Sequence, residues 1–241
     1  MTTLAKNKYP KKPESPSKEV IRKHHTLVET LRSETSIQSL RFINSCIYGQ
    51  DQYNRFDPSR FYLVNLHDYK EKANLTLEEA FKEVKQLAIS HLENTIVIAP
   101  TADEVNYFHL IDAIDIIDQL KEVYIRWNPY AVALISGKLP KGHYEEYDNR
   151  MGKTSSYRSY LLYELIQTKL FLLDRFKQKS FTVATEELRR VTGCLDIYQE
   201  YKFFNSKVIQ PTLRDMGRFA NICLTSKGNK TEVTFYLEGM L

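Results

Sequence analysis

The sequence has few of the residues that build several common kinds of catalytic and structural site. Its 241 residues include three cysteines, which are far apart and form no C-x-x-C pair. Because such a set suits neither a disulfide framework nor a zinc site, Cys46, Cys194 and Cys223 are interpreted as reduced, half-buried packing residues. Only eight glycines are present, and no G-x-x-x-x-G-K-[ST] motif occurs. An NTPase or a kinase is therefore not expected.

Long apolar runs are also missing. No stretch of about 18 apolar residues occurs, so a membrane-spanning helix is not expected. The opening stretch, MTTLAKNKYPKKPESPSKEV, lacks the apolar centre of a secretory signal. These absences favour a cytoplasmic protein without a membrane partner.

The six histidines include no His-x-His pair, so the metal site of a DNA-nicking tyrosine enzyme is not expected. His24 and His25 are adjacent, and neighbours on a helix point about 100° apart, which suits a metal poorly. We interpret this pair as a solvated helix start. The sequence has two acidic clusters, Glu145–Glu146 and the set Asp112, Asp115 and Asp118. Both are interpreted as solvated surfaces. The sequence therefore predicts no enzyme: no catalytic residues, no metal and no cofactor.

What the sequence does contain is an uneven distribution of charge. Residues 1–23 carry 7 basic and 2 acidic side chains, residues 24–150 carry 13 and 19, and residues 151–241 carry 14 and 9. A basic tail, an acidic middle and a basic last third thus lie within a net charge of +4. Such asymmetry favours a protein with one end that binds a polyanion.

Composition divides the chain into three parts. Residues 1–18 combine three prolines with five lysines, which predicts a disordered basic arm. An N-terminal domain is expected over 19–147 and a C-terminal domain over 148–241. The boundary is placed within 137–155, where glycine, proline, Asn and Asp concentrate.

The clearest helix of the N-terminal domain covers residues 74–95. Thr76 and Glu79 have the spacing of a capping box. Its expected buried stripe is Leu77, Phe81, Val84, Ala88 and Leu92. The other expected elements are helices over 24–34 and 36–49, a loop over 51–60, a strand over 61–66, β-like pieces over 95–100, 107–117 and 123–127, and a helix from Asn128 with Pro129 at its first position.

The C-terminal domain shows a simple succession of patterns. A long helix over 156–176 precedes a short strand over 181–183 and a helix over 185–193, with Thr185 as its cap and Gly193 as its stop. A further helix and two strands, over 219–226 and 231–239, complete the chain. Helix, strand, helix, helix, hairpin is the order of a winged helix-turn-helix. Two loosely similar copies would fit the length, so we expect an α+β fold of two tandem winged-helix domains.

The helix over 203–216, FFNSKVIQPTLRDM, has an unusual polar side. Its expected buried side holds Tyr201, Phe204, Val208, Thr212 and Met216. The opposite side contains cations, an amide, a hydroxyl and a bare ring, but no acid. Arg and Lys can donate to guanine, Gln can bond adenine, and an apolar ring can pack on a thymine methyl. The predicted DNA-binding residues on this helix are Lys202, Phe203, Ser206, Lys207, Gln210 and Arg214.

The turn between the last two strands is basic. Lys227, Asn229 and Lys230 would lie at its tip, where the lysines could reach phosphates of double-stranded DNA. An ordinary solvated surface remains an alternative, because most soluble domains contain a helix with one polar face. Pro211 removes the hydrogen bond to the Lys207 carbonyl. The helix therefore either bends at Pro211 or consists of two short helices that meet at Gln210.

Three stretches of this part resemble the C-terminal winged helix of bacterial plasmid replication initiators, the iteron-binding Rep proteins. They are SYLLYELI (Ser159–Ile166), EELRRVTG (Glu186–Gly193) and YKFFNSKVIQPTLRDM (Tyr201–Met216). The proline of the last stretch matches the family pattern, and the Gly228 turn matches its basic hairpin. Leu161 and Asn229 stand where the family usually has Arg. The first half is similar in a weaker way.

The resemblance implies a DNA-binding protein that recognises direct repeats at a replication origin, mainly through its second domain. It further implies that the protein bends or melts nearby DNA, recruits the host helicase and its loader, and represses its own gene as a dimer. Dimerisation would involve the first domain. A transcriptional regulator of the same fold is the alternative. In the first domain Lys82 and Lys85 could also contact DNA, or their helix could be a scaffold.

Overall fold

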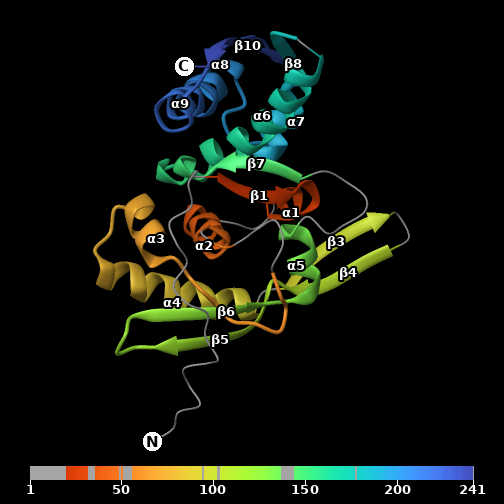
Figure 1. Ribbon diagram of the computed structural model, residues 1–241. Coiled ribbons are helices and arrows are strands. Elements are labelled where there is room, and N and C mark those ends of the chain that lie inside the picture. Colours follow the sequence, from red (N-terminus) through yellow and green to blue (C-terminus); the bar gives the residue numbers. More distant parts are fainter. Residues whose placement is uncertain are drawn as a thin grey trace, which may run out of the picture. The chain divides into compact units, whose positions relative to one another are not determined.

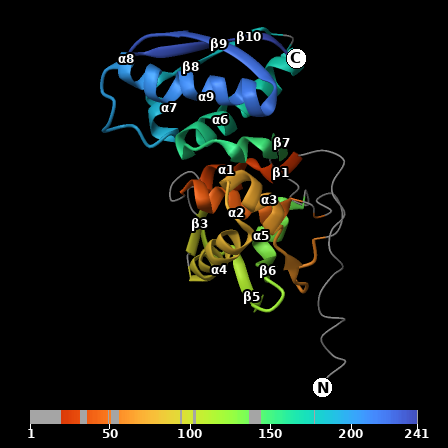
Figure 2. The same ribbon diagram turned by 90° about the vertical axis from the view of Figure 1, so that its left-hand side faces the viewer.

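The computed structural model describes residues 20–31, 36–48, 50, 56–93, 95–101, 104–136, 144–176 and 178–240. The chain separates into two compact units: Met1–Leu31 with Gln38–Asn149, and Arg32–Ile37 with Arg150–Leu241. The arm expected over 1–18 lies outside the described residues. Figures 1 and 2 show a mixture of helices and small sheets in each unit.

The second unit follows the expected order of elements. Helix α6 (Tyr157–Phe176) leads to strand β8 (Ser180–Ala184) and helix α7 (Thr185–Val191). A long helical segment comes next, and strands β9 (Ile222–Gly228) and β10 (Glu232–Met240) complete the unit. The antiparallel sheet has the order β8-β10-β9. In Figure 2 the long segment, labelled α8 and α9, runs beside this sheet.

Apolar burial explains how these elements pack. Tyr160 and Tyr163 of α6 are fully buried, as are Leu188 of α7 and Phe204 of the long segment. From the sheet, Phe235 is also fully buried, and its ring stacks on Phe181 with centroids 5.1 Å apart. Full burial of side chains of this size stabilises a domain by roughly 1.5–3 kcal/mol each.

The two predicted ends of α7 have different outcomes. The N-cap is Ala184, which makes no side-chain cap, so the prediction of Thr185 as the cap is wrong. The Thr185 hydroxyl instead donates to the Asn229 carbonyl at 2.9 Å, across to the β9–β10 turn. Gly193 has φ +64°, a left-handed conformation that stops a helix, as predicted.

The first unit contains more elements than the second. Its helices are α1 (His25–Leu31), α2 (Ile37–Ile47), α3 (Leu66–Ala73), α4 (Leu77–Glu93) and α5 (Pro129–Ile135). Its strands are β1 (Val20–His24), β2 (Tyr62–Leu63), β3 (Thr95–Thr101), β4 (Glu104–His109), β5 (Ile111–Ile117), β6 (Glu122–Trp127) and β7 (Tyr144–Asp148). They form the sheets β2-β6-β5, β3-β4 and β1-β7, all antiparallel.

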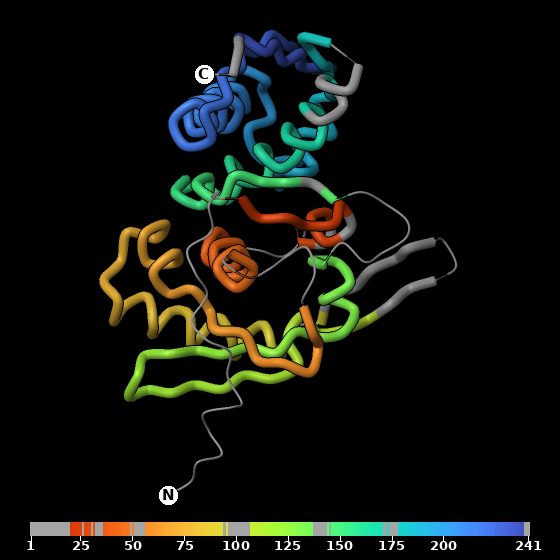
Figure 3. The backbone as a smooth tube through the Cα atoms, viewed as in Figure 1, coloured from red at the N-terminus to blue at the C-terminus, as the bar shows by residue number. Residues whose placement is uncertain are grey.

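A common connectivity is present in both units. In the first, α2, β2, α3, α4, β5 and β6 follow one another, with the sheet order β2-β6-β5. In the second, α6, β8, α7, the long segment, β9 and β10 do the same, with the order β8-β10-β9. The first unit inserts the β3–β4 hairpin after α4 and adds β1, α1, α5 and β7. The tube trace in Figure 3 lets both successions be followed by colour.

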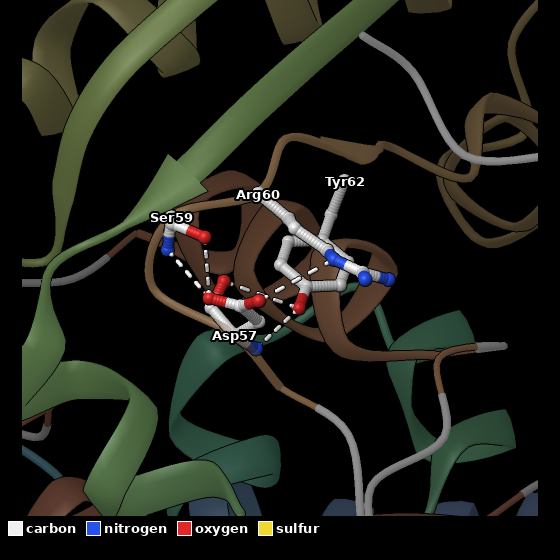
Figure 4. A network of polar contacts seen from close by, with 4 residues as sticks. All are labelled: Asp57, Ser59, Arg60 and Tyr62. Atoms are coloured by element: carbon white, nitrogen blue, oxygen red, sulfur yellow. Dashed lines mark hydrogen bonds and ion pairs between the residues drawn. The ribbon is translucent and has the colours of Figure 1, made fainter. Parts of the chain in front are cut away.

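Several expectations for the first unit are confirmed. The Thr76 N–H donates to Glu79 Oε2 at 2.9 Å and the Glu79 N–H donates to Thr76 Oγ1 at 3.3 Å, which is the capping box. Asn128 caps α5 by accepting from the Tyr130 N–H at 2.9 Å. The described part of the loop expected over 51–60 turns at Asp57. Figure 4 shows the Asp57 carboxylate joined to Ser59 and Arg60, and the Tyr62 hydroxyl joined to the Asp57 backbone.

Other expectations are wrong. Leu77 is 40% exposed and Leu92 half-buried, whereas Ala80 and His91 are buried, so the buried stripe of α4 differs from the predicted one. The single piece expected over 107–117 is two strands, β4 and β5, in different sheets.

His24 is not a solvated helix start. It is 3% exposed at the end of β1, and its ring packs edge-on against Tyr144 at 4.9 Å. Strand β7, its partner, lies within the stretch expected to hold the domain boundary.

His91 is a buried titratable group of α4. Its ring stacks on Phe42 with centroids 5.3 Å apart, and burial lowers the pKa of His91 to about 4. An unfolded histidine titrates at about 6.5. Between about pH 6.5 and about pH 4, His91 is therefore protonated in the unfolded state but neutral in the folded state. The free energy of unfolding falls as the pH is lowered through this range.

We expect His91→Gln to remove part of this acid sensitivity, because glutamine carries no titratable proton. The wild-type free energy of unfolding should fall by about 2 kcal/mol more than that of the variant between about pH 7 and about pH 5. Urea unfolding at the two pH values measures this. Parallel loss in both proteins would contradict a buried neutral His91.

Candidate nucleic-acid interface

The long helical segment of the second unit runs without interruption from Tyr201 to Ala220. It is built from α8 (Tyr201–Phe204), the π-turn η2 (Asn205–Ile209), α9 (Gln210–Asp215) and the π-turn η3 (Met216–Ala220). Asn221 ends it with φ 55°. Pro211 neither ends the helix nor separates two helices at Gln210, because Ile209 and Gln210 keep helical dihedrals.

The π-turn η2 accommodates the proline. Pro211 has no N–H to donate and its ring would crowd the carbonyl four residues earlier. The Gln210 N–H bonds the Asn205 carbonyl, five residues back, and α9 then begins with Pro211 in its first turn. The change to a hydrogen bond that spans five residues therefore falls directly before the proline.

One side of this helix is buried and the other is exposed. The buried side chains are Phe204, Val208, Ile209, Thr212, Leu213, Met216 and Ala220. The exposed ones, which we call the acid-free face, are Lys202, Phe203, Ser206, Lys207, Arg214 and Arg218. Within Tyr201–Ala220, all of which the structure describes, the only acid is Asp215. It is half-buried and accepts a hydrogen bond from Thr154 Oγ1 at 2.6 Å.

The predicted DNA-binding residues of the helix occupy different environments. Lys202, Lys207 and Arg214 are exposed, and Phe203 presents a ring that is 49% exposed. The Ser206 hydroxyl donates to the Phe203 carbonyl at 3.2 Å, which leaves its oxygen able to accept.

Two residues of the helix depart from the sequence interpretation. Gln210 is half-buried, and its side-chain amide donates within the protein. Sequence reasoning missed Arg218, whose guanidinium lies over the Phe219 ring at 5.0 Å. Its spacing of four residues from Arg214 was a usable signal, because residues four apart share one side of a helix.

The tip of the β9–β10 hairpin, Lys227–Lys230, comprises the end of β9 and the start of the turn, and it carries the other predicted contacts. We call it the basic turn. Lys227, Asn229 and Lys230 are all exposed. Asn229 Oδ1 accepts hydrogen bonds from the Thr231 N–H at 2.8 Å and the Glu232 N–H at 3.2 Å. Asn229 therefore shapes the turn, and the two lysines flank it.

The basic turn lies next to the start of the helix. A Cβ added to Gly228 would come within 2.6 Å of the Tyr201 hydroxyl and 2.8 Å of the Glu232 carbonyl oxygen. Only glycine permits so close an approach. Burial raises the pKa of Tyr201, so its hydroxyl keeps its proton. The structure thus brings the acid-free face and the basic turn together on adjacent elements.

Arg189 of α7 holds the connection between α7 and the helix. Its guanidinium donates to the carbonyls of Cys194, Ile197 and Gln199 at 3.3, 3.1 and 3.1 Å. It also lies over the Phe204 ring at 4.6 Å. Sequence reasoning missed this role, because carbonyl acceptors leave no trace in residue identity.

Lys82 and Lys85 lie on α4, in the first unit. Lys82 is exposed. Lys85 Nζ pairs with Asp118 Oδ1 at 2.8 Å, and Lys121 Nζ pairs with Glu78 Oε1 at 2.9 Å. Both pairs join α4 to the β5–β6 hairpin. The exposed side of α4 therefore carries both signs of charge, unlike the acid-free face.

Two other kinds of site are absent from the described ranges. No group of three or more His, Cys, Asp or Glu residues there could hold a metal ion. No helix among those residues is both long and apolar enough to cross a membrane.

Comparison with solved structures shows that the chain is similar in fold to a replication initiator. The chain matches the crystal structure of the Pi initiator protein in complex with iteron DNA, with a TM-score of 0.74. The match covers 92% of this chain and 98% of that one, at 16% sequence identity. The resemblance predicted from the sequence is thus confirmed at the level of the fold.

Two further structures give weaker matches. They are the WH1 domain of MSBI1.176, a replication protein, with a TM-score of 0.38 at 13% identity, and domains 2 and 3 of RctB, with 0.43 at 10%. The first match covers 47% of this chain and 88% of that chain, and the second covers 96% and 94%. No family model and no curated protein sequence matches the chain.

Proposed function

We propose that this chain is a plasmid replication initiator that binds iteron repeats at a replication origin. The observation that carries the proposal is the pairing of the acid-free face with the basic turn in the second unit. It occurs on a fold shared with an initiator whose structure contains iteron DNA. A surface with several cations and no acid suits double-stranded DNA, because a carboxylate there would repel the phosphates.

In this proposal each unit is a winged-helix domain, and the two stand in tandem. The common connectivity supports it, since both units run helix, strand, helix, helix, hairpin. In the second unit α7 and the long helix form the helix-turn-helix, and β9–β10 is the wing. The long helix would enter a major groove, where Lys207 and Arg214 are placed to meet base edges. Lys227 and Lys230 would contact the phosphates beside it.

The first unit has a secondary role in this proposal. Its counterpart helix, α4, exposes Lys82, but the acids Glu78 and Asp118 lie beside its other cations. Mixed charge supports a weaker contact with an adjacent stretch of DNA. The unit would also provide the interface of a dimer that represses its own gene, while the monomer starts replication.

The action of the protein at the origin would be non-enzymatic. Several protomers on tandem repeats would bend the DNA and help to melt the neighbouring duplex, and the complex would recruit the host helicase and its loader. Bending a site costs of order 1–6 kcal/mol, which cooperating protomers can supply.

A mobility-shift titration tests the function. The full chain is titrated on DNA fragments from both sides of its gene, with competitor DNA and at two salt concentrations. Stepwise, salt-sensitive complexes on a fragment with direct repeats support the initiator. Tight binding only at a lone inverted repeat favours a transcriptional regulator. No complex at low salt contradicts DNA binding altogether.

Arg214→Ala should weaken binding to the preferred duplex by about 1–3 kcal/mol and relax the preference at one base pair. The reason is that an arginine on the exposed side of a groove-bound helix donates two hydrogen bonds to guanine. Competition with duplexes that differ at single base pairs measures it. Unchanged affinity for the preferred duplex would remove Arg214 from the interface.

Lys227→Ala should weaken binding to all duplexes alike and reduce the salt slope by about 1. A lysine in the basic turn contacts phosphate, which carries no sequence information. Titrations over a range of salt give the slope, and Lys179→Ala, an exposed lysine ahead of β8, is the matched control. An effect confined to one sequence would contradict the phosphate role.

A further inference from the structure

Gln210 uses its side-chain amide inside the protein. Its Nε2 donates to Ser226 Oγ at 3.1 Å and to Asn205 Oδ1 at 3.3 Å. An amide nitrogen carries two hydrogens, so these two acceptors take both. Bidentate recognition of adenine needs one of those hydrogens together with the amide oxygen. The side chain that the sequence assigns to base recognition is therefore already occupied.

The π-turn creates this arrangement. In a regular α-helix, residues five apart lie about 140° apart around the axis, so Asn205 and Gln210 would point to different sides. The wider η2 turn bonds the Gln210 N–H to the Asn205 carbonyl and brings their side chains together. From there the Gln210 amide reaches Ser226, which directly precedes the basic turn.

A second contact joins the same two elements. The Tyr201 hydroxyl lies against Gly228, where an added Cβ would come within 2.6 Å of it. Helix and hairpin thus meet at Tyr201–Gly228 and at Gln210–Ser226, on either side of Lys227. Two separated contacts restrict rotation of the hairpin against the helix more than one does.

We propose that Gln210 and Ser226 are positioning residues that set the basic turn against the acid-free face. The inference rests on the proposed function, because its consequence is a fixed spacing between base contacts and phosphate contacts. Gln210 itself does not read a base. A preorganised surface loses less conformational freedom on binding, so the Gln210–Ser226 hydrogen bond raises affinity although neither residue touches DNA.

The Gln210–Ser226 contact is tested first without DNA. Hydrogen–deuterium exchange of the full chain follows the amides of the basic turn, among them the Asn229 N–H, which bonds the Glu232 carbonyl at 2.9 Å. Gln210→Ala and Ser226→Ala should each accelerate exchange there by roughly two- to tenfold, the equivalent of one lost hydrogen bond. Gln178→Ala, an exposed glutamine before β8, is the matched control. Unchanged exchange in both variants overturns the proposal.

The second measurement uses the duplex that the wild-type chain selects from a randomised library. Gln210→Ala and Ser226→Ala should lower affinity for all duplexes to the same extent and reduce the salt slope, as is also expected of Lys227→Ala. The double variant should lose no more than either single one, because neighbouring partners are not additive. Ser226→Thr keeps the hydroxyl and should retain wild-type binding.

Base reading predicts a different result. Gln210→Ala would then relax the preference at one base pair, and Ser226→Ala would leave it unaltered, which overturns the positioning role. If the wild-type chain selects no sequence, the proposed function fails, while the exchange result still decides whether Gln210 holds the basic turn.

Discussion

The missing N–H of Pro211 is the constraint around which the second unit is arranged. A proline in the middle of a long helix costs about 3 kcal/mol when its crowding and its lost hydrogen bond are not relieved. The helix continues through this position, and the π-turn η2, with its wider hydrogen bond from the Gln210 N–H to the Asn205 carbonyl, lies directly before the proline. The same turn places Gln210 beside Asn205 and Ser226. A backbone requirement and a contact between helix and hairpin thus have one cause.

Close packing and hydrogen bonds to carbonyls then hold the two segments beside the long helix, namely the β9–β10 hairpin and the connection from α7. Gly228 lets the hairpin approach Tyr201, Asn229 closes the basic turn, and Arg189 holds the chain that enters the helix by three carbonyls. Each contact involves backbone atoms, so each restricts the path of the chain as well as a side chain. Functional groups on such a supported surface keep their spacing, which is what recognition of a regular duplex requires.

The elements with strong local signals could be predicted from the sequence. The capping box of Thr76, the Asn128–Pro129 start of α5 and the order of elements after residue 156 depend on residues near one another, and they are confirmed. Strands β1 and β7 were missed because their pairing joins residues more than a hundred positions apart. Helix α3 was missed because it is short and mostly polar, and its cap, Asn65, is one of many asparagines.

The candidate site shows the same division. The exposed side of the helix followed from periodicity, and the structure places Lys202, Phe203, Ser206, Lys207 and Arg214 there. The environment of Gln210 could not be predicted, because periodicity assumes a regular α-helix and the π-turn changes which residues face one another. Asn229 likewise has the composition of a polar contact, whereas its oxygen closes the turn.

The two units solve the same packing problem with different chemistry. Each must hold a hairpin against the helix that precedes it. The first unit does so with ion pairs, Lys85–Asp118 and Lys121–Glu78, which neutralise two of the cations of that surface. The second does so with a neutral amide and a hydroxyl, Gln210 and Ser226, so no carboxylate is needed for this contact. The one acid of the helix, Asp215, is half-buried and accepts a hydrogen bond from Thr154. Exposed ion pairs contribute only about 0–1 kcal/mol to stability. Holding the hairpin by ion pairs or by a neutral hydrogen bond therefore makes little difference to the free energy of unfolding. This choice has a large effect on the electrostatic potential that a polyanion meets, and that difference is the physical reason for the proposal that the principal DNA contact lies in the second unit.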